Sequence, residues 1–309
     1  MSVVNQPLPN LELIDLLGRG GTAMVYRARQ LSTGREVAVK VLDADFVRTQ
    51  EDVNRFVNEA KACGRFQHRN IVRVYDAGAK DGFYWFVMEL IGGYTFAQYL
   101  KKHPRLDPED CMVILESVTS ALSYAWQRFR VVHCDLKPDN LMVDTDGTIK
   151  LMDLGISRSI IDLNNENTHH INVMPEEGPE DEIMGTPAYM SPDQIYDLPD
   201  LDCRADIYSL GATLYHLLTG SILFPNKTDQ EVVDMHVSAH FARDPRTLVP
   251  EIPRGLAIML NRMLAKDRTL RYPNWETLAA DIKRLYAGKT LLATPLKPGE
   301  SSVAFAANL

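Results

Sequence analysis

Apolar residues form two short runs near the start of the chain, and both runs predict β-strands. In REVAVKVL, residues 35–42, every second residue is a valine, so the three valines share one face of a strand while Ala38 and Lys40 lie on the other. FYWFVMEL, residues 83–90, is a nearly continuous apolar run bounded by polar residues, which also indicates a strand. The first 90 residues therefore predict a small β-rich unit.

A helical pattern separates these two strands and carries a charge on its apolar side. Residues 51–66 place apolar side chains at helical spacing, and Glu59 falls on the same stripe. A buried carboxylate needs a partner, and so does a lysine such as Lys40 within an apolar strand. A Lys40–Glu59 ion pair would satisfy both groups and hold the ammonium where it could also bind a phosphate. The alternative is an edge strand from which Lys40 points into water.

The pattern becomes mainly helical after Gly92-Gly93. Asp107 is the expected N-cap of a first helix, and two short strands, 141–143 and 148–153, follow on either side of an Asp-Thr-Asp-Gly turn. Small, polar residues with Pro and Gly predict a tail or linker at 288–309. The sequence thus predicts a β-rich lobe and a helical lobe that meet near the two glycines. Further helices are expected around 205–219, 229–240, 255–264 and 274–286.

The longest uncharged run, residues 207–224, raises the question of a membrane span. It contains no Asp, Glu, Lys or Arg and just reaches the length that a bilayer requires. However, it includes several hydroxyl side chains, His216, and a glycine at position 220 that is typical of a helix end. These features favour a buried core helix, so we predict no membrane insertion within this chain.

Composition and charge narrow the class of protein further. The chain has 309 residues, of which 45% are hydrophobic and 24% charged, as in ordinary globular proteins, and this length corresponds to about two units. The net charge of −8 argues against nucleic acid as a partner. The four cysteines form no C-x-x-C pair, which favours a reducing compartment over a zinc cluster or disulfide framework. The first residues lack the basic and apolar regions of a secretory signal, so a cytoplasmic location is expected.

A glycine-rich stretch, LGRGGTAMV at residues 17–25, precedes a strand-like segment. Glycines let a backbone bend sharply and bring its N–H groups close to phosphate oxygens, although most such stretches are ordinary turns. No Gly-Lys-Ser/Thr follows, so the stretch is not a Walker loop. A strand rather than a helix comes next, which excludes a dinucleotide fingerprint. Taken alone, the stretch does not decide between a turn and a phosphate-binding loop.

Two polar motifs, HCDLKPDN and LMDLG, flank the pair of short strands, so their side chains are expected to converge at the strand ends. Asn140 and Asp153 offer the oxygen ligands that a hard cation such as Mg²⁺ prefers. Asp135 is a carboxylate that could orient and deprotonate a hydroxyl. Lys137 could neutralise charge that builds on a transferred group. Any one of these residues is more often found in an ordinary turn, but the whole set in this order indicates a catalytic site.

The order of these motifs resembles that of the protein kinases, and most closely the eukaryotic-like (Hanks-type) serine/threonine kinases of bacteria. The resemblance covers about residues 11–287 and implies an α+β, bilobal protein-kinase-like fold. A small β-rich N-lobe with one key helix (about 11–91) would precede a larger, mainly helical C-lobe (about 92–287). The matching positions are Gly18, Gly20, Val25, Lys40, Glu59, His133, Asp135, Lys137, Pro138, Asn140, Asp153, Gly155, residues 185–194 and residues 206–220.

The resemblance implies ATP-dependent transfer of a γ-phosphoryl group to Ser or Thr hydroxyls of protein substrates, with Mg²⁺, or Mn²⁺ as an alternative. The implied metal ligands are Asn140 and Asp153. The implied catalytic residues are Asp135, Lys137, Lys40, Glu59 and Thr186. The implied nucleotide-binding residues are Leu17, Gly18, Arg19, Gly20, Gly21, Thr22, Ala23, Met24, Val25, Ala38, Lys40, Met88, Glu89, Ile91 and Met142. In this last set, the side chains of Val25, Ala38 and Met142 would pack on adenine, Met88 would be the gatekeeper, and backbone groups of Glu89 and Ile91 would meet the edge of the base.

Several positions depart from the pattern of the family. Ala23 replaces the third glycine of the loop, and Thr22 stands where an aromatic residue is usual. Leu154 replaces the aromatic residue of the metal-binding motif and is expected to fill the same apolar slot. Asp193 replaces a glutamate that pairs with an arginine, here Arg271. Because aspartate is one methylene shorter, the sequence leaves open whether this pair forms.

Cys134 stands where many kinases have an arginine that binds a phosphorylated residue of the activation segment. A thiol carries no positive charge, so we hypothesise that activation does not run mainly through a phosphate held here. In a variant of this hypothesis, the acidic residues within 159–183 replace the phosphate charge, and the alternative is a solvated acidic loop. Acidic neighbours disfavour a reactive thiolate, so Cys134 is expected to be a small packing residue rather than a redox site.

Three functions compete on these grounds. An active protein kinase is favoured because every residue expected to touch ATP, metal or the acceptor hydroxyl is present. A pseudokinase scaffold or nucleotide-binding module on the same fold is the alternative, since fold alone does not determine function. A small-molecule kinase is disfavoured by the GTPAYMSP element, which resembles a platform for protein substrates. The sequence leaves open a homodimer, and also a role as the cytosolic part of a larger or membrane-tethered protein.

Overall fold

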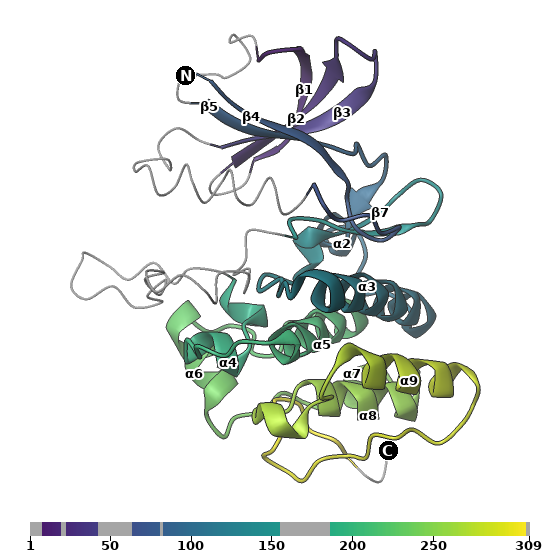
Figure 1. Ribbon diagram of the computed structural model, residues 1–309. Coiled ribbons are helices and arrows are strands. Elements are labelled where there is room, and N and C mark those ends of the chain that lie inside the picture. Colours follow the sequence, from purple (N-terminus) through teal and green to yellow (C-terminus); the bar gives the residue numbers. More distant parts are fainter. Residues whose placement is uncertain (1–7, 20–22, 43–63, 81–82, 155–185, 307–309) are drawn as a thin grey trace, which may run out of the picture.

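The computed structural model describes residues 8–19, 23–42, 64–80, 83–154 and 186–306, and they form two lobes (Figure 1). The smaller lobe is an antiparallel sheet of five strands in the order β1-β2-β3-β5-β4. Its strands are β1 (Leu11–Arg19), β2 (Ala23–Gln30), β3 (Glu36–Leu42), β4 (Val74–Lys80) and β5 (Phe83–Met88). Both strands that the apolar runs predicted, β3 and β5, are therefore confirmed.

The two faces of β3 differ as its alternating sequence predicted. Its three valines are fully buried in the core of the small lobe, and each contributes about 1.5–3 kcal/mol relative to an exposed position. Ala38 and Lys40 lie on the opposite face. The strand register places Val25 of β2 beside Lys40, and Met88 of β5 beside Ala38. The sheet thus brings these four residues together on the face opposite the valines.

The larger lobe is mainly helical and confirms the four later helices predicted from the sequence. A three-stranded sheet in the order β6-β7-β8 lies at the junction with the small lobe. Its strands are β6 (Tyr94–Thr95), β7 (Leu141–Val143) and β8 (Ile149–Leu151). The helices are α2 (Phe96–Leu100), α3 (Pro108–Phe129), α4 (Pro192–Ile195), α5 (Cys203–Thr219), α6 (Asp229–Val237), α7 (Pro245–Leu248), α8 (Arg254–Met263) and α9 (Trp275–Tyr286), with short 3₁₀ turns η3 (Pro138–Asn140), η5 (Pro187–Tyr189) and η6 (Arg268–Leu270).

The uncharged run that raised the question of a membrane span is helix α5, and it is a buried core helix. It ends at Gly220, whose φ of 73° is the left-handed conformation that glycine adopts at a helix end. A Cβ at this position would lie 2.0 Å from the carbonyl oxygen of Pro104, so close backbone packing also requires glycine. Within the described ranges, every helix is too short or too polar to cross a bilayer.

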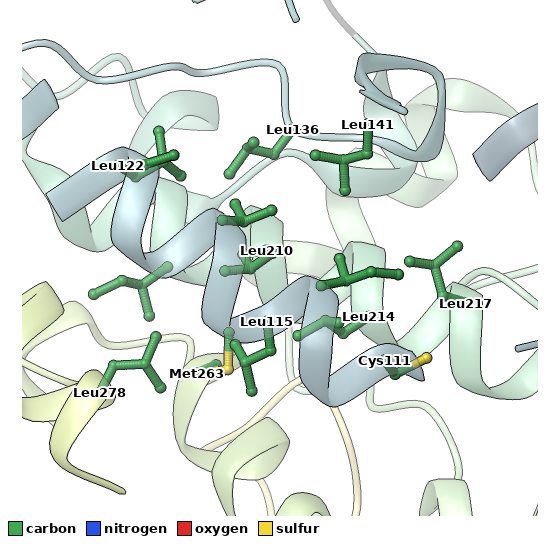
Figure 2. Packing of buried hydrophobic residues seen from close by; sticks show 14 of the residues in the cluster. Cys111, Leu115, Leu122, Leu136, Leu141, Leu210, Leu214, Leu217, Met263 and Leu278 are labelled. Carbon is green, nitrogen blue, oxygen red and sulfur yellow. The ribbon is translucent and has the colours of Figure 1, made fainter. Parts of the chain in front are cut away.

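Helix α5 lies at the centre of the large lobe, and its apolar side chains share one buried cluster with those of α3, α8 and α9. Figure 2 shows leucines of α3 and α5 interleaved, with Met263 of α8 and Leu278 of α9 closing the same cluster. The helix expected after Asp107 is α3, and it is part of this core, since Leu115, Val118 and Leu122 are almost completely buried. The loop that carries the HCDLKPDN motif joins α3 to β7. Leu136 of this loop and Leu141 of β7 belong to the same core, which holds the loop in place.

The segment after α9, predicted as a tail or linker, lies against the large lobe as far as residue 306 and runs beneath α8 (yellow in Figure 1). The carboxylate of Asp281 in α9 accepts hydrogen bonds from the backbone of Leu292 and Ala293, at 2.6 and 2.8 Å. Farther along, Ser302 and Val303 are buried. Through these contacts the segment packs as part of the large lobe.

Candidate active site

A buried carboxylate shapes the loop that carries the HCDLKPDN motif. Asp206, in the first turn of α5, accepts backbone hydrogen bonds from His133 at 2.7 Å and Cys134 at 2.9 Å. Burial raises the pKa of Asp206 above its ordinary value, and these hydrogen bonds oppose that shift. Cys134 has a φ of 62°, an uncommon conformation for a residue with a side chain. Asp206 therefore holds a strained turn at the start of the loop. The sequence contained a signal for this role, a carboxylate at the head of an apolar helix, but the prediction did not use it.

Three residues predicted to be catalytic, Asp135, Lys137 and Thr186, are brought together at the mouth of this loop. The Nζ of Lys137 lies 2.8 Å from Asp135 Oδ2 and donates to Thr186 Oγ1 at 2.8 Å. The hydroxyl of Thr186 lies 3.4 Å from the second carboxylate oxygen of Asp135. Because the Asp135 side chain is 35% exposed, its carboxylate is open to a molecule arriving from solvent.

Asn140 and Asp153, predicted to bind metal, flank Asp135 and Lys40. The amide nitrogen of Asn140 donates to the carbonyl of Asp135 at 2.7 Å and to its carboxylate at 3.0 Å, so its amide oxygen is turned away from that residue. The Nζ of Lys40 lies 2.8 Å from Asp153 Oδ1. Burial would raise the pKa of Asp153, but the charges of Lys40, His133 and Lys137 hold it below its ordinary value. Asp153 is therefore an anion at neutral pH.

The chemistry of this donor set suits a hard divalent cation that also has other ligands. Asn140 and Asp153 supply amide and carboxylate oxygens, and Mg²⁺ is commonly held by one or two such groups together with phosphate oxygens and water. The described residues contain no group of three or more His, Cys, Asp or Glu that could hold a metal by themselves. Glu59 lies outside the described ranges, so its pairing with Lys40 stays a prediction.

The predicted nucleotide-binding residues that are described lie on strands β1, β2, β3, β5 and β7 and in the connection between the lobes. Leu17, Gly18 and Arg19 end β1, while Ala23, Met24 and Val25 begin β2; Gly20, Gly21 and Thr22 are outside the described ranges. Met88 lies at the end of β5, and it lines one cavity together with Lys40, Asp153 and Leu154. Met142 lies on β7. Of the predicted nucleotide-binding residues, Lys40 and Met88 thus line this cavity, and the role of the others stays a prediction.

The connection between the lobes is fixed by an ion pair that the sequence analysis missed. The Nζ of Lys150, on β8, lies 2.7 Å from Glu89 Oε1, and both side chains are at least three-quarters buried. The backbone N–H of Glu89 donates to the carbonyl of Arg73 at 2.8 Å, which leaves the Glu89 carbonyl as the backbone group able to accept from a ligand. Ile91, two residues on, lies half-buried.

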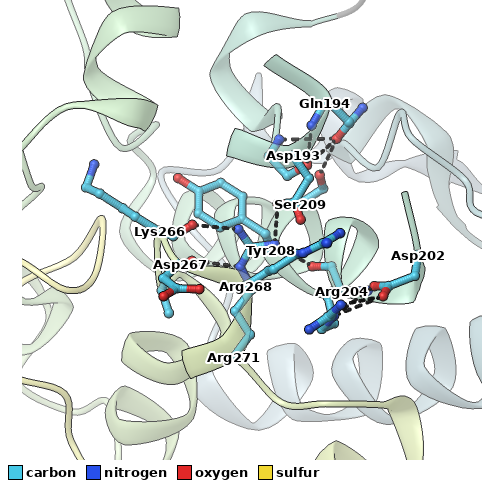
Figure 3. A network of polar contacts seen from close by, with 12 residues as sticks. Asp193, Gln194, Asp202, Arg204, Tyr208, Ser209, Lys266, Asp267, Arg268 and Arg271 are labelled. Carbon is cyan, nitrogen blue, oxygen red and sulfur yellow. Dashed lines mark hydrogen bonds and ion pairs between the residues drawn. The ribbon is translucent and has the colours of Figure 1, made fainter. Parts of the chain in front are cut away.

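The ion pair between Asp193 and Arg271 forms in spite of the shorter aspartate side chain. Asp193 Oδ2 lies 2.6 Å from Arg271 Nη1, and the two side chains are 4% and 0% exposed (Figure 3). Arg271 also donates to three backbone carbonyls and lies 5.0 Å from the ring centroid of Tyr208. This pair ties the residues that follow Thr186 to the 3₁₀ turn η6.

Two other departures from the family pattern have simple structural outcomes. Leu154 is 3% exposed and belongs to the main hydrophobic cluster, so it occupies the apolar slot as expected. Cys134 packs against the small apolar cluster of Val132, Leu201 and Ala205, and its carbonyl accepts from Gln194 at 2.7 Å. This fits a packing residue. The acidic segment that was proposed to replace a phosphate lies outside the described ranges.

Comparisons with known proteins agree with this geometry. The protein kinase domain family matches residues 11–281. The chain is 33% identical over 275 residues to the serine/threonine-protein kinase PrkC of Bacillus subtilis, which covers 89% of this chain and 40% of that protein. It is also 33% identical over 288 residues to the serine/threonine-protein kinase PknB of Mycobacterium tuberculosis, covering 90% of this chain and 43% of that protein. The chain therefore spans about two fifths of the length of these relatives.

A solved structure resembles the whole fold. The PknI kinase domain of Mycobacterium tuberculosis superimposes with a TM-score of 0.71 at 24% sequence identity, covering 93% of this chain and 100% of that one. This likeness supports the bilobal architecture, with its five-stranded small lobe and helical large lobe. Together with the family match and the identity to bacterial relatives, it establishes that the chain belongs to the protein kinase domain family, as a member of the Hanks-type serine/threonine group found in bacteria.

Proposed function

We propose that this chain transfers the γ-phosphoryl group of ATP to Ser or Thr hydroxyls of protein substrates. The observation that carries the proposal is the contact set of Asp135, Lys137 and Thr186, in which a solvent-accessible carboxylate lies 2.8 Å from an ammonium group. Protein kinases require a carboxylate that accepts the hydroxyl proton and cations that neutralise the transferred group. A pseudokinase is not favoured, because Lys40, Asp135, Lys137 and Asp153 are all present and make these contacts within the described residues.

Each member of the set has a role that follows from its position. The partly exposed Asp135 carboxylate can accept the proton of an incoming hydroxyl and orient its oxygen. The Lys137 ammonium, held between Asp135 and Thr186, can stabilise negative charge that builds on the phosphoryl oxygens. Little covalent chemistry is asked of the protein, so rate depends on positioning and charge neutralisation.

The family uses ATP and a divalent metal, and we infer that the metal is Mg²⁺, with Mn²⁺ as the alternative. Asn140 and Asp153 would hold it through their oxygens, and it would supply charge neutralisation between the phosphates. Lys40, fixed 2.8 Å from Asp153, is placed to contact the same phosphates. The donor set contains no sulfur or imidazole ligand, which favours a hard cation over zinc.

We infer that the nucleotide lies in the cleft between the lobes. The side chains of Val25, Ala38 and Met142 would pack against the adenine ring, Met88 would close the cleft as gatekeeper, and the Glu89 carbonyl would accept from the amino group of the base. The start of β2 and the end of β1 carry the residues of the glycine-rich loop, which would cover the phosphates. The ion pair of Lys150 with Glu89 would keep the backbone in place for this contact.

We infer that residues 186–190, named here the substrate platform, support the protein segment that carries the acceptor hydroxyl. Thr186 begins the platform and contacts both Lys137 and Asp135, so a backbone shift of the platform would move the two catalytic groups relative to the acceptor. Protein substrates are the expected partners, and nucleic acid is not. A homodimer and a cytoplasmic location are further expectations; the buried free thiols of Cys111 and Cys203 agree with a reducing compartment.

The test is phosphoryl transfer from labelled ATP with Mg²⁺ to a generic basic protein, using Asp135→Asn. General base catalysis contributes about 10²–10⁴-fold, so the variant should lose at least about a hundredfold in kcat while a thermal shift with ATP is retained. Asp146→Asn, in the exposed turn between β7 and β8, is the matched control and should keep full activity. Wild-type protein that binds ATP but transfers nothing would favour a pseudokinase, and an active Asp135→Asn would refute the assigned base.

A further inference from the structure

The segment after α9 is bound to the large lobe through isolated β-bridges at Ser301 and Val303. The backbone N–H of Ala242 donates to the carbonyl of Ser302 at 2.8 Å, and Ala304 donates back to the carbonyl of Ala242 at 2.9 Å. Ser302 also donates its own N–H to the carbonyl of Leu264 at 2.8 Å. Backbone hydrogen bonds to Ala242 on one side and to Leu264 on the other therefore fix the position of Ser302.

A second set of contacts clamps the same segment farther along. The carboxylate of Asp244 accepts from the N–H of Ala306 at 2.7 Å, while Arg246 donates to the carbonyl of Ala306 at 2.7 Å. The ring of Phe305 lies under the guanidinium groups of Arg246 and Arg254, at 4.5 and 5.1 Å from its centroid. Asp244 and Arg246 are themselves paired and almost completely buried. These contacts, together with the backbone hydrogen bonds of Ser302, hold the Ser302 side chain at one position in the lobe.

That place is the hydroxyl of Tyr208 in α5. Ser302 Oγ lies 2.7 Å from Tyr208 Oη, and the same phenol oxygen lies 2.7 Å from Nδ1 of His236 in α6. All three residues are completely buried. Tyr208 has one hydroxyl proton, so when it donates to His236 it must accept from Ser302. The three side chains form a directed chain of hydrogen bonds, and in a dry interior each bond polarises the next.

Helix α6, which carries His236, packs directly against η5, the 3₁₀ turn at Pro187–Tyr189 within the substrate platform. Burial lowers the pKa of His236 to about 3, so the imidazole is neutral. With Nδ1 accepting from Tyr208, the proton of the ring is on Nε2, which makes no hydrogen bond of normal geometry among the described residues.

Apolar packing joins the same three parts. Val303, next to Ser302, belongs to one buried cluster with Tyr208 of α5 and Tyr189 of the platform. The Tyr189 hydroxyl is in turn 2.7 Å from His216 Nδ1 on α5. The platform therefore rests on side chains that the segment after α9 contacts both through hydrogen bonds and through its valine.

We propose that Ser302 is a positioning residue for the substrate platform, acting through Tyr208 and His236 on residues 187–189. The proposal rests on the proposed phosphoryl transfer. It implies that a segment outside the matched kinase domain, which ends at residue 281, sets the affinity for protein substrate. The residues proposed to bind ATP lie on strands β1, β2, β3, β5 and β7 and in the connection between the lobes, whereas this chain of contacts joins α5, α6 and η5, so the proposal predicts an unchanged KM for ATP.

The test compares Ser302→Ala with Ser301→Ala in the full chain, using labelled ATP, Mg²⁺ and a generic basic protein as acceptor. Loss of one buried hydrogen bond corresponds to about a three- to tenfold change in an equilibrium constant. Ser302→Ala should therefore raise the KM for the acceptor about three- to tenfold and leave the KM for ATP as in wild type. Ser301 is also buried, but within the described part of the chain its hydroxyl accepts only from the N–H of Val303 in the same segment, at 3.2 Å. Ser301→Ala should therefore leave both constants unchanged.

Tyr208→Phe supplies an independent variant, because it removes the central hydroxyl and keeps the ring. It should show the same split between the two KM values, and combining it with Ser302→Ala should add little, since both changes break one chain. Hydrogen exchange of the amides at 188–190 should be faster in both variants. Equal behaviour of Ser302→Ala and Ser301→Ala, or equal changes in both KM values, would overturn the proposal. Absence of transfer by the wild-type protein would instead contradict the proposed function.

Discussion

The buried ion pair between Asp193 and Arg271 makes a sharp stability prediction, because Asp193→Asn removes its charge without leaving a cavity. At 2.6 Å, and at an effective dielectric constant of about 20, the attraction amounts to about 6 kcal/mol, but desolvation of both groups offsets much of it. Removing one partner leaves the other charge buried and typically costs about 3–5 kcal/mol.

The contacts of Arg271 place the expected cost at the lower end of that range. Its guanidinium keeps hydrogen bonds to the carbonyls of Ala265, Arg204 and Lys266, at 2.7, 2.9 and 3.0 Å, and these carbonyls stabilise the remaining charge. We therefore expect Asp193→Asn to lower the free energy of unfolding by about 3 kcal/mol. For a domain of this size, that corresponds to a fall in Tm of roughly 6–12 °C.

The assay is urea and thermal unfolding of the purified chain, with Asp200→Asn as matched control. Asp200 pairs with Arg268 of η6, which lies beside Arg271 (Figure 3). Because the Asp200 side chain is 66% exposed, loss of this ion pair should lower the free energy of unfolding by less than about 1 kcal/mol. Arg271→Met and the double variant complete a cycle in which the double variant should cost much less than the sum of the single changes. Equal losses for Asp193→Asn and Asp200→Asn would refute the reasoning.

Two further predictions follow from the described contacts. Gly93→Ala would place a Cβ 1.7 Å from the carbonyl oxygen of Val143, so it should lower the Tm and raise the KM for ATP. Gly34→Ala is the control, because a Cβ there meets no atom and only the left-handed φ of 69° is strained, at a cost of about 1–2 kcal/mol; its Tm should fall much less. A wild-type Tm after Gly93→Ala would contradict this. His236 is neutral in the folded chain with a pKa lowered to about 3, whereas it takes up a proton near pH 6.5 when unfolded, so it removes stability as the pH falls below 6.5, by about 1.4 kcal/mol per pH unit. His236→Gln should flatten the pH dependence of the unfolding free energy between pH 6.5 and 5, and an unchanged slope would show that another group is responsible.

Local patterns predicted most of the elements. Period-two alternation identified β3, and the uncharged run with a helix-end signal at Gly220 identified α5 as a core helix, because these patterns depend only on neighbours along the chain. The charged residues of the site were predicted from the order of motifs and their resemblance to a family. The strands β1 and β4 and the short elements β6, α2, α4 and α7 were not predicted; in α4 and α7, four residues carry too little periodicity.

The amino-acid sequence by itself thus determined the two lobes, the core helices, and which charged side chains could meet at the catalytic loop. Only the tertiary structure decided which partners are in contact when they lie far apart in the chain. Asp206 holds Cys134 from 72 residues away, Lys150 anchors Glu89 across 61, and Ser302 reaches Tyr208 across 94. No local pattern encodes such pairs, because each depends on two elements packing at one angle and depth. Asp193 illustrates the same reason: whether a shorter side chain reaches its arginine is decided by backbone placement alone, and here the two meet at 2.6 Å.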